Sequence, residues 1–348
     1  MAPVVPPTAE VTQTSTVPTQ RAANVNRAKR TPTDAPPTPT RAPEVEFYTV
    51  RANDSLWSVS RRYNVSLEAL ARENGLAPDS KLILGQRLRI PSVGDRKGLE
   101  LPPAAEVLPG VEERSLTELA PQLVRFLSSR SGESAAAVYL PESGKLYTLN
   151  PNERFEMASV VKVPIMVTQL RKMYRQDPDA STGGSPLLNS MITVSDNEAA
   201  TSLLREVGGP ASVEAELKAR GVSETDINPD AWGLSTTSAP DMALLMRSLY
   251  YGERLNRALR DAAILLMSGV VQEQRWGVPQ GLPNSEVAFK GGWLPVQGGW
   301  LVHQIGVAEV GGETVIFAFL NKGQPSFEYG KQTLKRAAEL LPKREQSR

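Results

Sequence analysis

The hydrophobic and polar positions divide the chain into four parts. Residues 1–44 contain nine prolines and nine threonines and almost no large apolar residue, a composition that predicts an extended stalk without a hydrophobic core. Residues 45–91 and 113–345 carry apolar positions at helix or strand spacing, whereas residues 92–112 contain prolines and glycines that predict a linker. We therefore expect a stalk, a small domain, a linker and a large domain.

The small domain shows a strand, helix, helix, strand pattern. Residues 47–50 and 82–90 predict the two strands, and Ser55 and Ser66 are placed to cap two helices whose apolar residues recur at helical spacing. The resulting βααβ unit spans about 45 residues and lies near the lower size limit of an independent domain.

The large domain has a longer pattern. Residues 115–129 predict a helix with Ser115 as its cap, and residues 134–150 predict two strands joined by a turn. A block of about 120 residues, 158–277, lacks clear strands, and three more strand candidates and a helix at 326–341 follow. This order predicts an α/β fold of the α+β type, in which a five-stranded antiparallel sheet is interrupted by an inserted, all-helical lobe.

Composition and charge exclude several classes of protein. The 348 residues include 39 Lys plus Arg and 38 Asp plus Glu, so bulk charge does not indicate binding to nucleic acid. There is no cysteine and only one histidine, His303, which argues against disulfides, a thiol nucleophile and a zinc site. We expect no metal and no cofactor. His303 lies in a predicted strand, and we expect its side chain to face the helical lobe.

The N-terminal region bears on the location of the protein. The first ten residues lack a basic segment followed by an apolar one, and the chain contains no run of 18 or more apolar residues. A long Pro/Thr stalk in front of a folded domain is nevertheless unusual in the cytosol. We therefore expect an exported protein, in the cell wall or at the cell surface, whose N-terminus has been processed or truncated.

Three short strings carry candidate chemistry. Ser159 precedes Lys162 by one helical turn in the apolar stretch FEMASVVKVPIM, where burial can keep the lysine neutral and able to act as a base for the serine hydroxyl. Residues 195–197, Ser-Asp-Asn, begin a predicted helix, and Lys290 ends a predicted strand before two glycines. Each string also has a plain structural interpretation, as a helix start, a capping cluster and a turn, respectively.

The small domain resembles the LysM family over its full length, in YTVRANDSLWSVSRRYNVSLEALARENGL and LILGQRLRIP. In that family, a shallow groove binds the N-acetylglucosamine chains of peptidoglycan or chitin. The resemblance implies peptidoglycan as a partner, and a small spacer domain is the alternative. The implied groove is formed by two loops, with the residues Asn53, Asp54, Ser55, Leu56, Leu82, Ile83 and Leu84.

In combination and in order, the three strings of the large domain resemble the motifs of the penicillin-recognising serine hydrolases, which include class A β-lactamases and D,D-peptidases. The segment WGLSTTSAPDMALLMRSL is also similar to that family. The resemblance implies Ser159 as the acylated nucleophile, Lys162 as its base or proton relay, and Ser195 as the proton shuttle to the leaving nitrogen. It implies that Lys290 attracts a substrate carboxylate and keeps Lys162 neutral by repulsion. The implied substrate-binding and oxyanion groups are Asn197, Gly292 and the backbone N–H groups of Ser159 and Trp293.

Two departures from the family pattern concern specificity and turnover. The residue after the motif lysine is usually Thr or Ser and binds the substrate carboxylate, but here it is Gly291. Class A β-lactamases remove the acyl group with a glutamate that an asparagine follows four residues later, and Glu224 and Asn228 match that spacing in a shorter, dissimilar loop. Glu224 is therefore a candidate deacylation base, with a surface carboxylate as the alternative.

The sequence leads to one main hypothesis and two alternatives. The main hypothesis is a wall-associated serine hydrolase that forms an acyl-enzyme with a β-lactam or with a stem-peptide amide of peptidoglycan. The first alternative is a non-catalytic peptidoglycan-binding protein whose hydrolase domain has decayed, and the second is an esterase of the same fold. The oligomeric state is left open.

Overall fold

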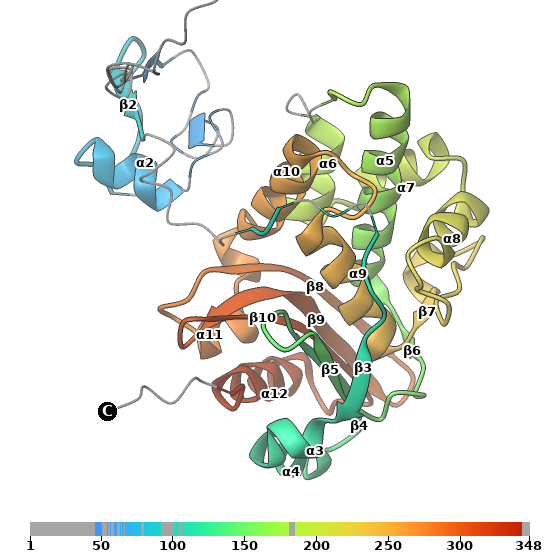
Figure 1. Cartoon of the computed structure of the whole chain (residues 1–348). Helices are drawn as coiled ribbons and strands as arrows, with labels where there is room; N and C mark the ends of the chain where they lie inside the picture. Colours follow the sequence, from blue (N-terminus) through green and yellow to red (C-terminus); the bar gives the residue numbers. More distant parts are fainter. Residues whose placement is uncertain are drawn as a thin grey trace, which may run out of the picture. The chain divides into compact units, whose positions relative to one another are not determined.

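The computed structural model describes residues 46–50, 54, 56, 59–60, 63, 65, 67–77, 80–91, 101–103, 105, 107–180 and 185–342 (Figure 1). The predicted stalk, residues 1–44, lies outside this part of the chain. Within the described ranges, no helix is long and apolar enough to cross a membrane. The small domain extends to Pro91, and the large domain is described from Leu101 onwards.

Among the described residues, the small domain has two short antiparallel strands, a helix, and helical residues at 56 and 59–60 where the sequence predicts the first helix. Strand β1, Glu46–Thr49, pairs with β2, Arg87–Ile90, and helix α2, Leu67–Glu73, packs against β2. The buried side chains of its core include Val50, Leu56, Val59, Leu70 and Leu88.

Strand β2 is shorter than the sequence predicts. Residues 83–86 form a turn in which the Gln86 N–H donates to the Ile83 carbonyl at 2.9 Å. Gly85 has a φ of 82°, a left-handed conformation that suits glycine and redirects the chain just before Arg87. Residues 82–84 therefore belong to a loop and not to the strand.

A six-stranded sheet forms the centre of the large domain, in the order β3-β5-β4-β10-β9-β8. Neighbouring strands are antiparallel, except that β3 and β5 are parallel. Strands from the two ends of the domain meet where β4 pairs with β10, as the sequence predicts. The strands are β3 Glu112–Ser115, β4 Glu133–Leu140, β5 Lys145–Leu149, β8 Val287–Val296, β9 Gly299–Val310 and β10 Glu313–Lys322.

The prediction of five strands misses β3. All four of its residues are exposed, so it lacks the alternation of apolar and polar positions that marks the other strands. The helix predicted from residue 115 is also interrupted, because it forms α3, Leu116–Leu119, and α4, Pro121–Ser128. Pro121 has no N–H to continue the first helix and instead starts the second.

Helices cover both faces of the sheet (Figure 1). Helix α12, Phe327–Glu339, packs on one face with α4 and the short α11, Val278–Gly281, around a core that includes Phe317 and Phe319. The helical lobe packs on the other face, around a second core that includes Ile305. The lobe contains α5 Lys162–Gln176, α6 Pro186–Thr193, α7 Asn197–Glu206, α8 Pro210–Lys218, α9 Ala239–Tyr251 and α10 Arg257–Ser268.

Part of the predicted linker contacts the large domain. The Ala105 N–H donates to the Tyr251 carbonyl at 3.0 Å, and the Arg247 guanidinium donates to the Pro109 carbonyl at 2.7 Å. The described residues between 101 and 110 therefore pack against the lobe before the position at which the sequence predicts that the large domain begins.

Candidate active site

The predicted nucleophile lies at the entrance to the first lobe helix. Ser159 is part of a single 3₁₀ turn, Ala158–Val161, that leads directly into α5. The chain reaches this turn through the short strand β6, Phe155–Glu156, which pairs with β7, Thr236–Thr237. Ala158 has a φ of 45°, a left-handed conformation that costs a residue with a Cβ about 1 to 2 kcal/mol. Backbone strain of this kind is typical of positions that hold a side chain for chemistry.

Strand β8 approaches the same turn closely at Gly292. A Cβ at this position would lie 2.9 Å from the Met157 carbonyl oxygen and 3.0 Å from the Ser159 backbone nitrogen. The absence of a side chain therefore allows the β8 backbone to lie beside the Ser159 N–H. An oxyanion site formed by the N–H groups of Ser159 and Trp293 requires the two backbones to lie this close together. The oxyanion role of these two N–H groups stays a prediction.

The Lys162 amine occupies the centre of the site. The side chain is fully buried, and its Nζ lies 3.0 Å from Ser159 Oγ, 3.0 Å from Ser195 Oγ and 2.7 Å from Asn197 Oδ1. It also donates to the Ser195 carbonyl at 2.6 Å. Burial lowers the pKa of Lys162 from 10.5 to about 8, although Asp196 acts to raise it. A substantial fraction of the amine is therefore neutral near pH 8 and able to accept the Ser159 proton.

Ser195 joins this amine to a second lysine. The Ser195 Oγ accepts from Lys290 Nζ at 3.0 Å, and the same amine donates to the Gly291 carbonyl at 2.8 Å. Lys290 is fully buried, and burial, followed by the charge of Lys162, holds the pKa of Lys290 well below 10.5. Burial is the main reason why the pKa of Lys162 is low, rather than the repulsion by Lys290 that the resemblance implies.

The capping interpretation of the Ser-Asp-Asn string holds for its middle residue. The Asp196 carboxylate accepts from the Glu198 N–H at 2.8 Å and so caps helix α7. Ser195 and Asn197 place their side-chain oxygens against Lys162 instead. The string therefore both starts a helix and contributes to the site.

One residue of the site was not found by sequence reasoning. The Lys162 Nζ lies 5.2 Å from the centroid of the Trp232 ring, which is within the range of a cation–π interaction. The indole N–H donates to Thr201 Oγ1 on α7 at 3.1 Å and thereby fixes the ring. The only signal for Trp232 is that it begins the segment WGLSTTSAPDMALLMRSL, which resembles the serine hydrolases.

Gly291 faces an aromatic ring. A Cβ at this position would lie 3.3 Å from two carbon atoms of Trp276, which is itself buried. The Trp276 ring is fixed by edge contacts with Trp293 and Phe327, at centroid distances of 5.5 and 5.2 Å. The space beside Lys290 into which a Thr or Ser side chain would extend is therefore bordered by an indole ring.

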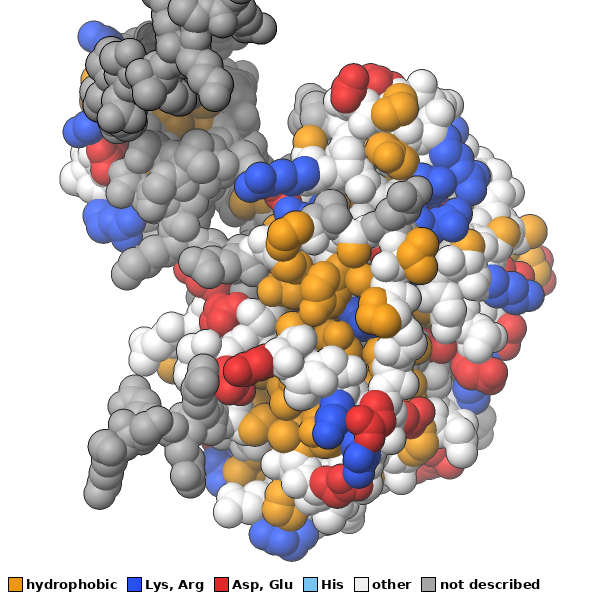
Figure 2. Space-filling view, in the orientation of Figure 1, with side chains coloured by type: hydrophobic (Ala, Val, Ile, Leu, Met, Phe, Trp, Pro, Cys, Tyr) orange, Lys and Arg blue, Asp and Glu red, His pale blue; other side chains and the backbone are white. Residues whose placement is uncertain are grey.

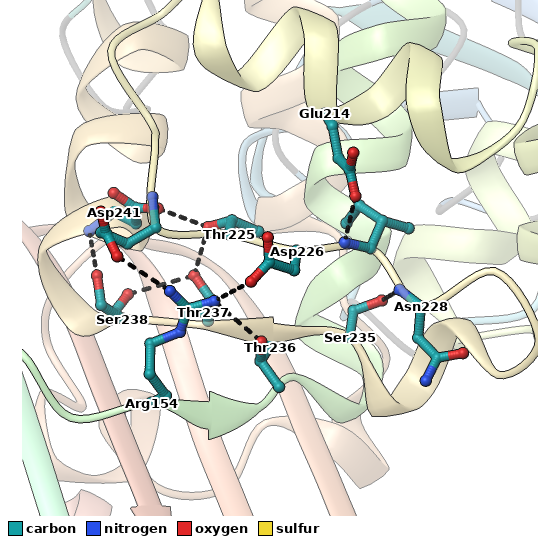
Figure 3. A network of polar contacts seen from close by, with 12 residues as sticks. Arg154, Glu214, Thr225, Asp226, Asn228, Ser235, Thr236, Thr237, Ser238 and Asp241 are labelled. Atoms are coloured by element: carbon teal, nitrogen blue, oxygen red, sulfur yellow. Dashed lines mark hydrogen bonds and ion pairs between the residues drawn. The ribbon is translucent and has the colours of Figure 1, made fainter.

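Glu224 takes part in an ion pair at the surface. Its carboxylate pairs with Arg154 at 3.1 Å, and its side chain is 66% exposed. Arg154 also binds Asp226 at 2.6 Å, in the network of polar contacts that Figure 3 shows. Within the described ranges, no hydrogen bond or ion pair joins Glu224 to Ser159 or Lys162. The geometry thus agrees with a surface carboxylate and gives no support to Glu224 as a deacylation base.

His303 is buried beside β6 and takes a neutral, structural form. Its Nε2 lies 2.9 Å from the Glu156 carbonyl, and its Nδ1 accepts from the Asn321 N–H at 3.0 Å. Because Nδ1 is an acceptor, the proton is assigned to Nε2. Burial lowers the pKa of His303 to about 4, so the ring is neutral at physiological pH.

The residues predicted to line the glycan-binding groove of the small domain differ in their exposure. Asn53 and Ser55 lie outside the described residues. Leu56 is buried in the domain core and offers no surface to a glycan, so its assignment to the groove is wrong. Ile83 and Leu84 are exposed in the loop before β2, at 73% and 72%, Leu82 is half-buried, and Asp54 accepts a hydrogen bond from the Tyr48 hydroxyl.

Comparison with known families supports both domains. Residues 48–91 match the LysM domain, and residues 182–344 match the family described as the Beta-lactamase enzyme family. The second match begins after Ser159 and Lys162, so the assignment of that pair rests on the geometry described above. No match was found among curated protein sequences.

Several solved structures have a similar fold. An acyl-enzyme complex of a PBP-A mutant with penicillin G has a TM-score of 0.57 and 23% identity, and the match covers 67% of this chain and 97% of that protein. A β-lactamase from Chitinophaga pinensis has a TM-score of 0.54 and 20% identity over 63% of this chain and 96% of the other. A β-lactamase from Streptosporangium roseum has a TM-score of 0.56 and 20% identity over 65% of this chain and 97% of the other.

At these identities the similarity establishes the fold and not the substrate. The fold agrees with the sequence resemblance, as do the matched families and the meeting of Ser159, Lys162, Ser195 and Lys290 in one buried site. The chain therefore carries a LysM domain followed by a domain with a β-lactamase-like fold, part of which, residues 182–344, matches the Beta-lactamase enzyme family.

Proposed function

We propose that the large domain is an acyl-transferring serine hydrolase whose nucleophile is Ser159. The observation that carries this proposal is the continuous contact from Ser159 Oγ to Lys162 Nζ, to Ser195 Oγ and to Lys290 Nζ, each at 3.0 Å. These contacts connect the Ser159 hydroxyl to the buried Lys162 amine, whose pKa is lowered to about 8. A lysine can act as a general base only when its pKa is lowered in this way.

The proposed reaction uses these groups in sequence. The Ser159 Oγ attacks the carbonyl carbon of an amide, and its proton passes to the neutral Lys162 amine. The negative charge that develops on the carbonyl oxygen is stabilised by backbone N–H donors at the Ser159 turn and at β8. The proton then moves from Lys162 through the Ser195 hydroxyl to the leaving nitrogen as the C–N bond breaks, and the acyl group remains as an ester on Ser159.

The proposed substrates are β-lactams or the stem-peptide amides of peptidoglycan. Support comes from the similar PBP-A structure, which contains an acyl-enzyme with penicillin G, and from the LysM domain on the same chain. Because Glu224 is paired with Arg154 away from Lys162, we expect slow removal of the acyl group and hence the behaviour of a penicillin-binding protein more than that of an efficient β-lactamase.

An esterase of the same fold is a second candidate, and one observation favours it. The ring of Trp276 borders Gly291, so a hydroxyl that would bind a substrate carboxylate is replaced by an apolar surface. An ester without a carboxylate would need only Ser159, Lys162 and the oxyanion donors.

We further propose that the LysM domain binds the glycan chains of peptidoglycan through the loop that exposes Ile83 and Leu84. We propose, on the basis of such a partner, that the protein acts outside the cytoplasm, in the cell wall or at the cell surface. Holding the hydrolase domain on the polymer would raise its effective substrate concentration without any new contact at Ser159.

A panel of substrates tests the proposal and separates the candidates. The full chain is assayed with nitrocefin, with a peptide that ends in D-Ala-D-Ala and with a p-nitrophenyl ester, in parallel with the Ser159→Ala variant. Turnover or burst acylation by the first two substrates supports the main proposal, and ester turnover alone supports the esterase. Absence of reaction with all three supports the non-catalytic alternative and contradicts the proposal.

Co-sedimentation with purified peptidoglycan tests the glycan proposal separately. The double variant Ile83→Ser with Leu84→Ser should stay in the supernatant, because it removes the exposed apolar surface of the loop. Retention equal to that of the unaltered chain would contradict glycan binding by this loop.

A further inference from the structure

A cavity on the helical lobe lies away from the Ser159 site. Its volume is about 400 Å³, and it is lined by residues of α5 and α8 and by Val207, which follows α7. Helix α5 begins at Lys162 and contributes Arg171, Lys172 and Arg175 to the cavity. At a rise of 1.5 Å per residue, the backbone positions of these three residues lie about 14 to 20 Å along the helix from that of Lys162.

Positive charge exceeds negative charge around this cavity. The described lining contains one carboxylate, that of Glu216. It forms ion pairs with three guanidinium groups, those of Arg220 at 3.0 Å, Arg254 at 3.4 Å and Arg175 at 3.8 Å. The cations of this cluster are Arg171, Lys172, Arg175, Arg220 and Arg254, and the neighbouring carboxylates are Glu206, Glu216 and Glu253.

The excess of positive charge is local to this cavity. Over the whole chain, the 39 Lys plus Arg nearly balance the 38 Asp plus Glu. Figure 2 shows Lys and Arg side chains gathered on the lobe, in the region where α5, α7 and α8 are labelled in Figure 1. A cluster of this kind raises the local concentration of anions.

Among the described residues, three guanidinium groups of the cluster have a buried nitrogen atom without a hydrogen-bond partner. These atoms are Arg171 Nε, in the cavity lining, Arg220 Nη2, and Arg254 Nε, which lies 3.4 Å from Glu216 in an ion pair. Burial is the largest cause that lowers the pKa of Arg171 and that of Arg220, and the charge of Arg254 adds to the lowering. Buried donors without acceptors cost free energy, which a bound anion would offset.

We infer that this cavity binds a phosphate-type oxyanion, held by Arg171, Lys172 and Arg175, as a second site independent of the chemistry at Ser159. Guanidinium groups present forked N–H donors that match the oxygen atoms of a phosphate. Ser212, from α8, also lines the cavity and supplies a hydroxyl. A phosphomonoester and a phosphodiester within a polymer share this chemistry.

Calorimetric titration of the full chain at low ionic strength tests the inference. The probes are inorganic phosphate, which represents a monoester, and dimethyl phosphate, which represents a diester. We expect saturable binding of at least one probe with a stoichiometry of one, weakened by added salt. Preference for inorganic phosphate assigns a terminal phosphate, and preference for dimethyl phosphate assigns a phosphodiester. Failure of both probes to saturate would overturn the inference.

Matched variants locate the site. The Arg175 side chain is 62% exposed, so Arg175→Gln should leave the fold intact while binding the preferred probe about tenfold more weakly, the loss expected for one charge-assisted hydrogen bond. The control is Arg336→Gln on α12, where the side chain is 53% exposed on the other face of the sheet, and its affinity should be unchanged.

Ser212→Glu provides a second variant, because it introduces a carboxylate into the cavity. It should abolish phosphate binding and leave acylation of Ser159 unchanged. Equal phosphate binding by Arg175→Gln, Arg336→Gln and Ser212→Glu would overturn the inference. Neither result alters the tests of the hydrolase proposal.

Discussion

Two regions that the sequence singled out have very different surroundings in the structure. In the site around Ser159, Lys162 and Lys290 are fully buried and held between the start of α5, the start of α7 and strand β8. At Glu224, by contrast, the carboxylate is largely exposed and pairs with Arg154, whose contact with Asp226 is drawn in Figure 3. A lysine amine can act as a base where burial lowers its pKa, whereas a motif spacing that matches in a loop does not bury the carboxylate it predicts.

Of the substitutions in the two regions, Lys162→Gln should have the largest effect on the acylation rate of Ser159. This substitution removes the base but keeps a polar side chain among the surrounding oxygen atoms. Loss of a positioned general base typically slows a reaction by about 10² to 10⁴-fold, and we expect the acylation rate of Ser159 to fall in that range. Stopped-flow measurement with a chromogenic β-lactam or ester checks this, and an unchanged acylation rate would remove Lys162 from the mechanism.

A smaller effect is expected at the closest approach of strand β8. Gly292→Ala would place a Cβ 2.9 Å from the Met157 carbonyl oxygen, so the nucleophile turn or the strand must shift. We expect a loss of about 1 to 3 kcal/mol in the free energy of unfolding, together with slower acylation. Gly291→Ala is the matched control, because its Cβ would lie 3.3 Å from Trp276 and away from the turn. Urea denaturation checks both variants, and equal losses would contradict this account of Gly292.

The rate of Ser159 acylation should depend on pH. The neutral form of Lys162 accepts the proton, so the acylation rate should rise with pH and level off above the pKa of about 8. Below that pH the rate should fall about tenfold per pH unit. A rate that is flat between pH 6 and 9 would contradict the role of Lys162.

The lowered pKa of Lys162 also makes the free energy of unfolding depend on pH. Between pH 8 and 10.5 the unfolded chain keeps the Lys162 proton that the folded protein has released, so the free energy of unfolding should rise with pH in that window. The low pKa of Lys290 acts in the same direction.

The smallest effect is expected in the loop network. Glu224→Gln removes an exposed ion pair, which is typically worth about 0 to 1 kcal/mol, and it should leave both acylation and the lifetime of the acyl-enzyme unchanged. Time-resolved mass spectrometry of the adduct provides the check. A clearly longer lifetime in this variant would make Glu224 the deacylation base after all.

These contrasts reflect what the sequence can predict about this protein. The helical lobe and the strands that meet from both ends of the domain follow from apolar spacing. The grouping of Ser159, Lys162 and Ser195 in one site follows from the resemblance of the ordered motifs to the serine hydrolases. Strand β3 was missed because it has no buried face, and the helix break at Pro121 was missed because a single proline weighs little against apolar periodicity.

Long-range contacts explain the remaining differences at the candidate sites. Trp232 reaches Lys162 because Thr201, on another helix, holds its indole ring. The backbone of Glu224 is fixed by the Asp241 carboxylate, 17 residues away, which accepts from its N–H at 2.7 Å. Neither contact is visible in local spacing, so the lining of the site and the conformation of its neighbouring loop required the three-dimensional structure.

The intact mass of the full chain after incubation with penicillin G directly tests whether Ser159 is acylated. We expect a mass increase equal to that of one penicillin molecule, and no increase in Ser159→Ala. An adduct that persists in Ser159→Ala would contradict Ser159 as the nucleophile, and the absence of both an adduct and drug consumption in the unaltered chain would contradict the reaction with β-lactams.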